Sequence, residues 1–223
     1  MRLFAFCIVA AGAVSGRLSA QPGWFVGGGV GVSTLSGDAR SAISANATAL
    51  SQYKPENGPL AHFFAGRQFA EWLAVQGAYS WNRNSLTLTS ALFEGGRETL
   101  YEQSRGSRQH AGAVDAMVYF RGRSSWVRPY LSVGLGVSSF HSSRRELLTV
   151  KGSPDPPGQS FSATKPGLRA AAGIELLHRG GWGFRYAFLE TLQGNPIGAR
   201  LTPPGKRGLA NFQNQFGVVK YFR

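Results

Sequence analysis

The sequence has little cysteine, and its single cysteine lies where it can serve few purposes. Cys7 is within Leu3–Val14, an apolar stretch near the start of the 223-residue chain. If that stretch is removed on export, the remaining chain has no thiol for a disulfide, a zinc site or a nucleophile. The histidine and acidic residues show neither metal-ligand nor paired-carboxylate spacing, so we expect no metal and no cofactor.

Acidic residues are also scarce, and long apolar runs are missing. The chain has 24 lysine and arginine residues against 11 acidic ones, which gives a formal net charge of +13. The basic residues are spread along the chain rather than clustered, which favours an anionic envelope surface over nucleic acid as the partner. After the first twenty residues no run of 18 apolar residues occurs, so the sequence excludes a membrane-spanning helix.

The first twenty residues have the pattern of a secretory signal peptide. Arg2 supplies a positive charge, the apolar stretch Leu3–Val14 follows, and RLSA leads to Ala20. About a dozen apolar residues are too few for a transmembrane helix, which needs about 20. We therefore expect residues 1–20 to be a signal peptide, cleaved after Ala20 or alternatively after Ser15, and residues 21–223 to form the mature domain.

The mature chain is rich in alternating apolar and small or polar residues. Residues 127–140 (VRPYLSVGLGVSSF) set leucine and valine at positions 131–137 against serine and glycine. Eight segments of about ten residues follow this period of two, which is typical of strands with one apolar face. They are residues 24–33, 60–69, 72–81, 109–120, 127–140, 167–177, 182–189 and 211–222. Residues 60–69 have phenylalanine on both faces and Lys220 interrupts the apolar face of residues 211–222, so these two registers stay open.

The connections between these segments alternate in length. They are short after the second, fourth and sixth segments, and roughly twenty residues long after the first, third, fifth and seventh. Tight turns at one rim, long polar loops at the other and aromatic residues at strand ends are typical of membrane barrels. The sequence therefore predicts an all-β fold, an eight-stranded antiparallel up-and-down transmembrane β-barrel with both termini in the periplasm.

Four stretches carry a resemblance to a known family. They are GRQFAEWLAVQGAYSW (66–81), VRPYLSVGLGVSSF (127–140), GIELLHRGGWGFRYAF (173–188) and NFQNQFGVVKYF (211–222). These stretches resemble the bacterial outer-membrane β-barrel domain family, which comprises small, porin-like, OmpA- and OmpX-like barrels, and the resemblance covers essentially the whole mature chain. It implies insertion in the outer membrane of a Gram-negative-type bacterium, and recognition of the last strand by the barrel assembly machinery.

Charged residues occur on the polar face of several predicted strands. They are Asp115, Arg169, Glu175 and Arg185. Because this face lines the lumen, opposite charges are tolerated there only when they are paired and hydrogen-bonded. We predict that the four residues form a lumen polar network, which either holds the barrel shut or gates a narrow pore, with the first interpretation favoured. Arg128, next to a turn, is predicted to lie near the lipid headgroups.

Residues 140–146 (FHSSRRE) contain a candidate catalytic arrangement. His141, Ser143 and Glu146 resemble the His-x-Ser pair and carboxylate of the outer-membrane lipid A deacylases. The resemblance implies His141 as general base and Ser143 as nucleophile. In that family the histidine and serine face lipid, and the acid comes from a neighbouring strand. We interpret the alternation as placing His141 and Ser143 on the lumen face, so a simple loop start is favoured and no catalytic residue is assigned.

The sequence therefore predicts a non-enzymatic outer-membrane β-barrel with a structural or surface-interaction role. The alternatives are a narrow small-solute pore and, less favoured, a lipid A deacylase. The expected partners are outer-membrane lipids and lipopolysaccharide, whose phosphates suit basic outer loops such as the one with Arg200, Lys206 and Arg207. We expect a monomer that binds no nucleic acid.

Overall fold

The computed structural model describes residues 23–36, 40–43, 47–55, 57–151, 160–178, 180–196 and 208–222. The predicted signal peptide and the loop residues Arg200, Lys206 and Arg207 lie outside these ranges. Within them, no helix is long and apolar enough to cross a membrane. The strands are β1 (Gly23–Ser36), β2 (Arg40–Ile43), β3 (Ala47–Pro55), β4 (Asn57–Ala70), β5 (Leu73–Glu94), β6 (Arg97–Tyr119), β7 (Val127–Lys151), β8 (Ser160–Leu177), β9 (Trp182–Gly194) and β10 (Gly208–Tyr221).

Eight of these ten strands close into a ring. Each pairs antiparallel with its neighbours in the order β1, β4, β5, β6, β7, β8, β9, β10, and β10 pairs again with β1. Phe25 of β1 lies opposite Tyr221 of β10, so the first and last strands of the ring seal the sheet. A closed ring satisfies the backbone hydrogen bonds of every strand without a free edge. The predicted eight-stranded antiparallel barrel is confirmed.

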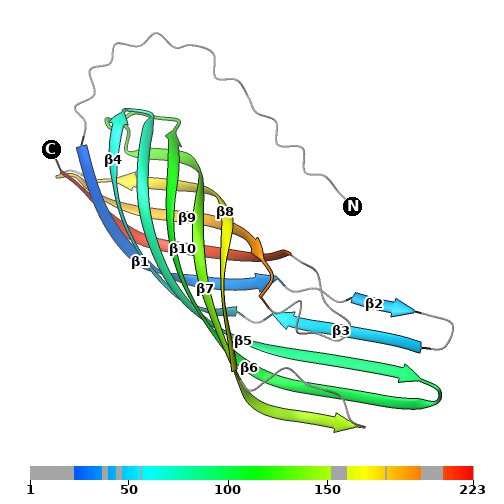
Figure 1. Cartoon of the computed structure of the whole chain (residues 1–223). Coiled ribbons are helices and arrows are strands. Elements are labelled where there is room, and N and C mark those ends of the chain that lie inside the picture. The colour runs from blue at the N-terminus through cyan, green and yellow to red at the C-terminus, as the bar shows by residue number, and fades with distance from the viewer. Residues whose placement is uncertain are drawn as a thin grey trace.

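The two ends of the ring differ. At one end, which we call the turn end, the strands join through short connections, which include Glu71–Trp72, residues 120–126, and His178 with Gly180–Gly181. At the other end, β5, β6 and β7 run on for total lengths of 22, 23 and 25 residues, against the roughly 9–11 that cross a membrane. There β3 pairs with the outer half of β5, and β2 pairs with β3 (Figure 1). We call residues 40–43, 47–55, 83–110 and 139–151 the projecting sheet.

The prediction of a long loop after residue 81 is wrong. Residues 82–94 continue β5, residues 97–108 belong to β6, and the two strands meet at Gly95 and Gly96. Both glycines have positive φ, 55° and 76°, as a two-residue type I′ hairpin turn requires. Likewise, β7 continues to Lys151, and the first long connection contains β2 and β3. Serine, threonine, asparagine and arginine on these segments removed the one-sided apolar pattern that marks a strand in lipid.

Apolar side chains cover the outward face of the ring. On β7 the leucine and valine residues at positions 131–137 are all exposed, Leu135 by 67%, while the alternate positions point inward. The structure also shows which side chains point outward in residues 60–69 and 211–222, which the sequence left undecided. Phe63 of β4 points outward and Phe64 inward, and Lys220 of β10 points outward with its Nζ donating a 2.7 Å hydrogen bond to the carbonyl oxygen of Gly180.

Candidate functional site

The barrel interior holds the polar residues that the sequence singles out, between two apolar layers. Toward the projecting sheet, six buried side chains from five strands pack across the lumen, and we call them the outer plug. They are Leu35, Leu86, Leu88, Phe140, Phe161 and Leu209. Toward the turn end a second apolar cluster includes Phe25, Phe64 and Met117. Between these layers a cavity of about 20 Å³ remains, which holds roughly one water molecule.

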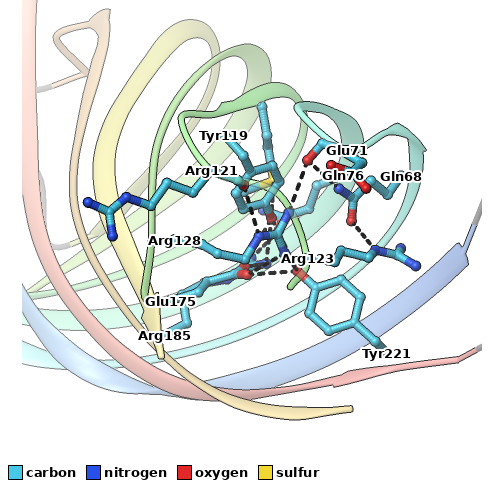
Figure 2. A network of polar contacts seen from close by, with 11 residues as sticks. Gln68, Glu71, Gln76, Tyr119, Arg121, Arg123, Arg128, Glu175, Arg185 and Tyr221 are labelled. Atoms are coloured by element: carbon cyan, nitrogen blue, oxygen red, sulfur yellow. Dashed lines mark hydrogen bonds and ion pairs between the residues drawn. The ribbon is translucent and has the colours of Figure 1, made fainter. Parts of the chain in front are cut away.

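Glu175 of β8 is the centre of the lumen network at the turn end (Figure 2). Its Oε1 accepts hydrogen bonds from Arg185 Nε at 2.8 Å and from Tyr119 OH at 3.0 Å, and Arg185 Nη2 also contacts it. Its Oε2 accepts one from Tyr221 OH at 2.7 Å and lies 3.3 Å from Arg128 Nη1. Both arginines and the glutamate are buried. One carboxylate therefore neutralises only one of two buried guanidinium charges, and neutral dipoles must stabilise the other.

Arg128 lies inside the barrel and not at the headgroups, so that prediction is wrong. Residue 128 has the same parity along β7 as the inward-facing Tyr130, and its side chain is 0% exposed. Its guanidinium lies 4.0 Å from the ring centre of Tyr119. It also donates to the backbone carbonyls of Arg121 and Glu71, each at 3.3 Å. Arg128 thus ties two of the short turns to the carboxylate of Glu175.

Asp115 and Arg169 form a separate ion pair in the lumen, further from the turn end than Glu175. Arg169 Nε lies 3.2 Å from Asp115 Oδ1, and both side chains are almost fully buried. Gly134 on β7 lies between them in the sheet, opposite Asp115 on one side and Arg169 on the other. A Cβ atom at Gly134 would collide with the Asp115 side chain, so glycine is needed for this close approach. The four predicted lumen residues therefore lie in two pairs, Asp115 with Arg169 and Glu175 with Arg185.

The sequence did not predict a fourth buried arginine, Arg105. Its Nη1 donates to Gln103 Oε1 at 2.8 Å and its Nε to Ser142 Oγ at 3.0 Å, and its guanidinium lies 4.9 Å from the ring centre of Phe161 in the outer plug. Residue 105 has the same parity along β6 as Asp115. That signal could have revealed it, had residues 82–108 been interpreted as strand.

His141 and Ser143 face outward, and their predicted lumen position is wrong. They share the parity of Leu135 and Val137 on β7, and both are exposed, whereas Phe140 and Ser142 are buried. His141 Nδ1 lies 2.8 Å from Ser162 Oγ of the neighbouring strand. Among the described residues, no carboxylate pairs with His141. The histidine therefore lacks the acid that a triad needs to orient it, and no group of histidine, cysteine and acidic side chains in the described residues suits a metal ion.

Comparison with known proteins places this barrel in a family. The sequence model of the outer membrane protein beta-barrel domain matches residues 3–214. The chain belongs to this family. It is therefore a protein of the Gram-negative outer membrane, as predicted. A search of curated proteins found no significant match.

Solved structures of similar fold are also outer-membrane proteins. Neisserial surface protein A (NspA) matches with a TM-score of 0.53 at 13% identity, over 89% of this chain and 97% of its own. Ail, the attachment invasion locus protein of Yersinia pestis, matches with a TM-score of 0.53 at 14% identity, over 91% of this chain and 100% of its own. At these identities the likeness shows the shared fold.

Because the family member lies in a membrane, the outward apolar face contacts lipid. Replacing Leu135 by arginine at the middle of this face is expected to lower the free energy of unfolding by about 2–4 kcal/mol, since the charge must leave water. Urea unfolding in phospholipid vesicles measures the loss. Ser143→Arg, on the same face of β7 beyond the apolar band, serves as the control and is expected to cost less than about 1 kcal/mol. Equal losses in the two variants would contradict this assignment of the lipid-facing band.

Proposed function

We propose that the protein is a non-enzymatic surface-interaction barrel that binds lipopolysaccharide phosphates through the base of its projecting sheet. The observation that carries this proposal is a cluster of three arginine side chains on the outward face. Arg83 of β5 and Arg108 of β6 lie directly opposite each other in the sheet, and both are exposed. Arg145 of β7 reaches across β6 and donates from Nη1 to Ser85 Oγ at 3.0 Å, one row further out.

The position of this arginine cluster suits a lipid phosphate. Arg83 comes after the exposed Tyr79 along β5, and Arg108 comes before the exposed Val114 along β6, so the cluster lies where the apolar band ends. Like charges directly opposite in a sheet are destabilising, and neither Arg83 nor Arg108 pairs with a carboxylate among the described residues. A phosphate between them would relieve the repulsion and accept bidentate hydrogen bonds. The phosphates of lipopolysaccharide lie at this level in the outer leaflet.

The projecting sheet as a whole supports a role outside the membrane. Its four ranges contain nine lysine and arginine residues against four glutamates. A basic sheet standing above the membrane attracts the anionic saccharides that surround it. Strand β2 and the part of β7 beyond Ser143 each have one unpaired edge among the described strands, which could pair with an extended segment of a partner. The sheet therefore offers both charge and backbone groups for surface contacts.

The two alternative functions are less well supported. A pore needs a continuous aqueous path, but the outer plug and the Glu175 network occupy the lumen at two levels. A deacylase needs a carboxylate that orients the histidine, and His141 contacts Ser162 instead. We further propose that the protein acts as a monomer and that the assembly machinery recognises β10 together with the residue that follows it, where Phe216, Val218 and Phe222 are exposed.

Replacing both Arg83 and Arg108 by glutamine is expected to weaken lipopolysaccharide binding about tenfold. The reason is that two charge-assisted contacts to phosphate are lost, and each is partly screened because it is exposed. Together they are worth on the order of 1.4 kcal/mol, which is a factor of ten. Binding of purified lipopolysaccharide to the protein in detergent, at fixed low salt, measures the change.

The matched control removes two positive charges elsewhere, Arg97 at the hairpin tip and Arg121 in a short turn. If Arg97→Gln/Arg121→Gln weakens binding equally, net charge and not the arginine cluster is responsible, and the proposal fails. Lipid A extracted from cells that overproduce the protein is expected to keep its mass. A loss of one acyl chain that disappears with Ser143→Ala would overturn the non-enzymatic assignment.

A further inference from the structure

The lipid-facing surface of the barrel has an open apolar groove. It has a volume of about 1000 Å³ and crosses β1, β4, β5 and β6, with Trp182 and Lys220 at one end. Small residues form its floor, Gly28, Ala65, Gly77 and Gly112, and Phe63 and Tyr79 lie along it. This volume is at the upper end of the range for small-molecule sites. A second, smaller groove of about 390 Å³ lies elsewhere on the ring, between Leu135, Leu168 and Leu192.

The fold does not require glycine at two positions of the groove floor. A Cβ atom at Gly112 would meet nothing within 4 Å, and one at Gly77 would meet only the carbonyl oxygen of Ala65 at 3.8 Å. Both glycines have ordinary strand geometry, since positive φ is confined to other glycines among the described residues. Larger side chains would fit at both positions, and the groove exists because the chain has glycine there. In a membrane such a hollow loses dispersion contacts unless a flexible chain fills it.

Lys220 lies at the end of the groove nearest the turn end. Lys220 lies opposite Val26 of β1 and Trp182 of β9. Its Nζ donates to Gly180 O at 2.7 Å and lies 4.9 Å from the ring centre of Trp182. An ammonium group has three donors, so two remain for another acceptor. Tryptophan and lysine in this position are typical of the membrane–water interface, where lysine reaches toward the headgroups.

A second cation lies on the same rim, two residues along β4 from Ala65. Arg67 stacks between two exposed aromatic rings, with its guanidinium carbon 5.5 Å from the ring centres of both Trp24 and Phe69. The turn end of a barrel with short turns faces the periplasm. The leaflet on that side contains phospholipid, whose phosphate complements Lys220 and Arg67. The two cations suit a phosphate, and the apolar groove suits an acyl chain, so both features favour a phospholipid.

We propose that this groove is a binding site for one phospholipid of the inner leaflet. One acyl chain lies along Gly28, Gly77 and Gly112, and the phosphate accepts hydrogen bonds from the free N–H groups of Lys220. The site is separate from the arginine cluster, which lies at the opposite end of the apolar band. Its ligand is a glycerophospholipid and not lipopolysaccharide.

The test fills the groove without disturbing the backbone. The variant Gly77→Leu/Gly112→Leu places two side chains in the open space, and Ala170→Leu/Ala172→Leu on the outward face of β8 is the control of similar added bulk. Native mass spectrometry of the full mature chain, titrated in detergent with phosphatidylglycerol, measures lipid binding. Wild type and control are expected to retain one lipid with equal affinity, and the groove-filled variant to bind it at least about tenfold more weakly.

Two further arms identify the ligand chemistry. Lys220→Gln is expected to weaken phosphatidylglycerol severalfold but to leave diacylglycerol, which lacks a phosphate, unchanged. Lipid A is expected not to displace the bound phospholipid. Equal lipid binding by wild type and the groove-filled variant would overturn the proposal, and so would equal losses in the groove-filled and control variants or a protein dimer in place of bound lipid. If the groove-filled variant does not fold, as heat-modifiable migration on a gel would show, the Lys220→Gln comparison decides.

Discussion

Replacing Glu175 by glutamine is expected to lower the free energy of unfolding of the barrel by about 3–5 kcal/mol. Glutamine keeps the shape of the side chain but removes the charge that Arg185 and Arg128 face inside the lumen. Both guanidinium groups are buried and cannot turn to water. Removing one partner of a buried ion pair costs this much because the remaining charge stays desolvated and unpaired. Urea unfolding in phospholipid vesicles, followed by tryptophan fluorescence, measures the difference.

The matched control is Glu146→Gln, which makes the same chemical change at an exposed position of the projecting sheet. A surface change of this kind is expected to stay within about 0.5 kcal/mol. A loss below about 1 kcal/mol for Glu175→Gln would mean that water reaches the network and screens the arginines. The lumen would then not be sealed at the turn end.

Replacing Phe140 by alanine in the outer plug is expected to cost about 3–5 kcal/mol of unfolding free energy. Phe140 is 1% exposed, and its ring centre lies 6.0 Å from that of Phe161. Truncating a buried phenylalanine removes its burial and leaves a cavity that the stiff strands refill only in part. The same urea titration measures the loss. Phe93→Ala, at an exposed site on β5, is expected to cost less than about 1 kcal/mol.

The Phe140→Ala variant also tests how the lumen is closed. Although the plug loosens, the Glu175 network still spans the lumen at the turn end. In planar bilayers we therefore expect neither wild type nor Phe140→Ala to conduct ions. Steady conductance in wild type would favour the pore over the surface-interaction role. Conductance in the variant alone would show that the outer plug by itself closes the barrel.

The barrel itself could be predicted because lipid imposes a simple rule on each strand. Leucine and valine at positions 131–137 alternate with small residues because one face meets acyl chains and the other a narrow lumen. Outside the membrane the outward face of a strand meets water and carries polar residues, so the rule no longer applies, even where Leu86 and Leu88 pack inward in the outer plug. The outer halves of β5 and β6 therefore resembled a loop. Residues 60–69 were ambiguous for a related reason, since Phe64 packs inside the lumen while Phe63 faces lipid.

The lumen residues were predictable by type but not by partner. Parity along a strand gives the face of Asp115 or Glu175, whereas the partner depends on the register between strands far apart in sequence. Arg128 was misplaced because nearness to a turn was weighed above parity, and Ser143 because its parity was misjudged. Tyr221 was predicted, like other aromatic residues at strand ends, to lie at the membrane interface. Its hydroxyl points inward to Glu175 instead.

The place of Tyr221 in the network links closure of the sheet to the polar network in the lumen. Tyr221 is the last residue of the last strand, and its hydroxyl both donates to Glu175 and accepts from Arg128 Nη1 at 3.2 Å. A chain that stops short of β10 would leave those two groups facing an unclosed gap between β9 and β1. Glu175 and Arg128 would then each lose a hydrogen-bond partner at the seam where the sheet closes. Pairing of β10 with β1 therefore also completes the hydrogen bonds of the buried charges.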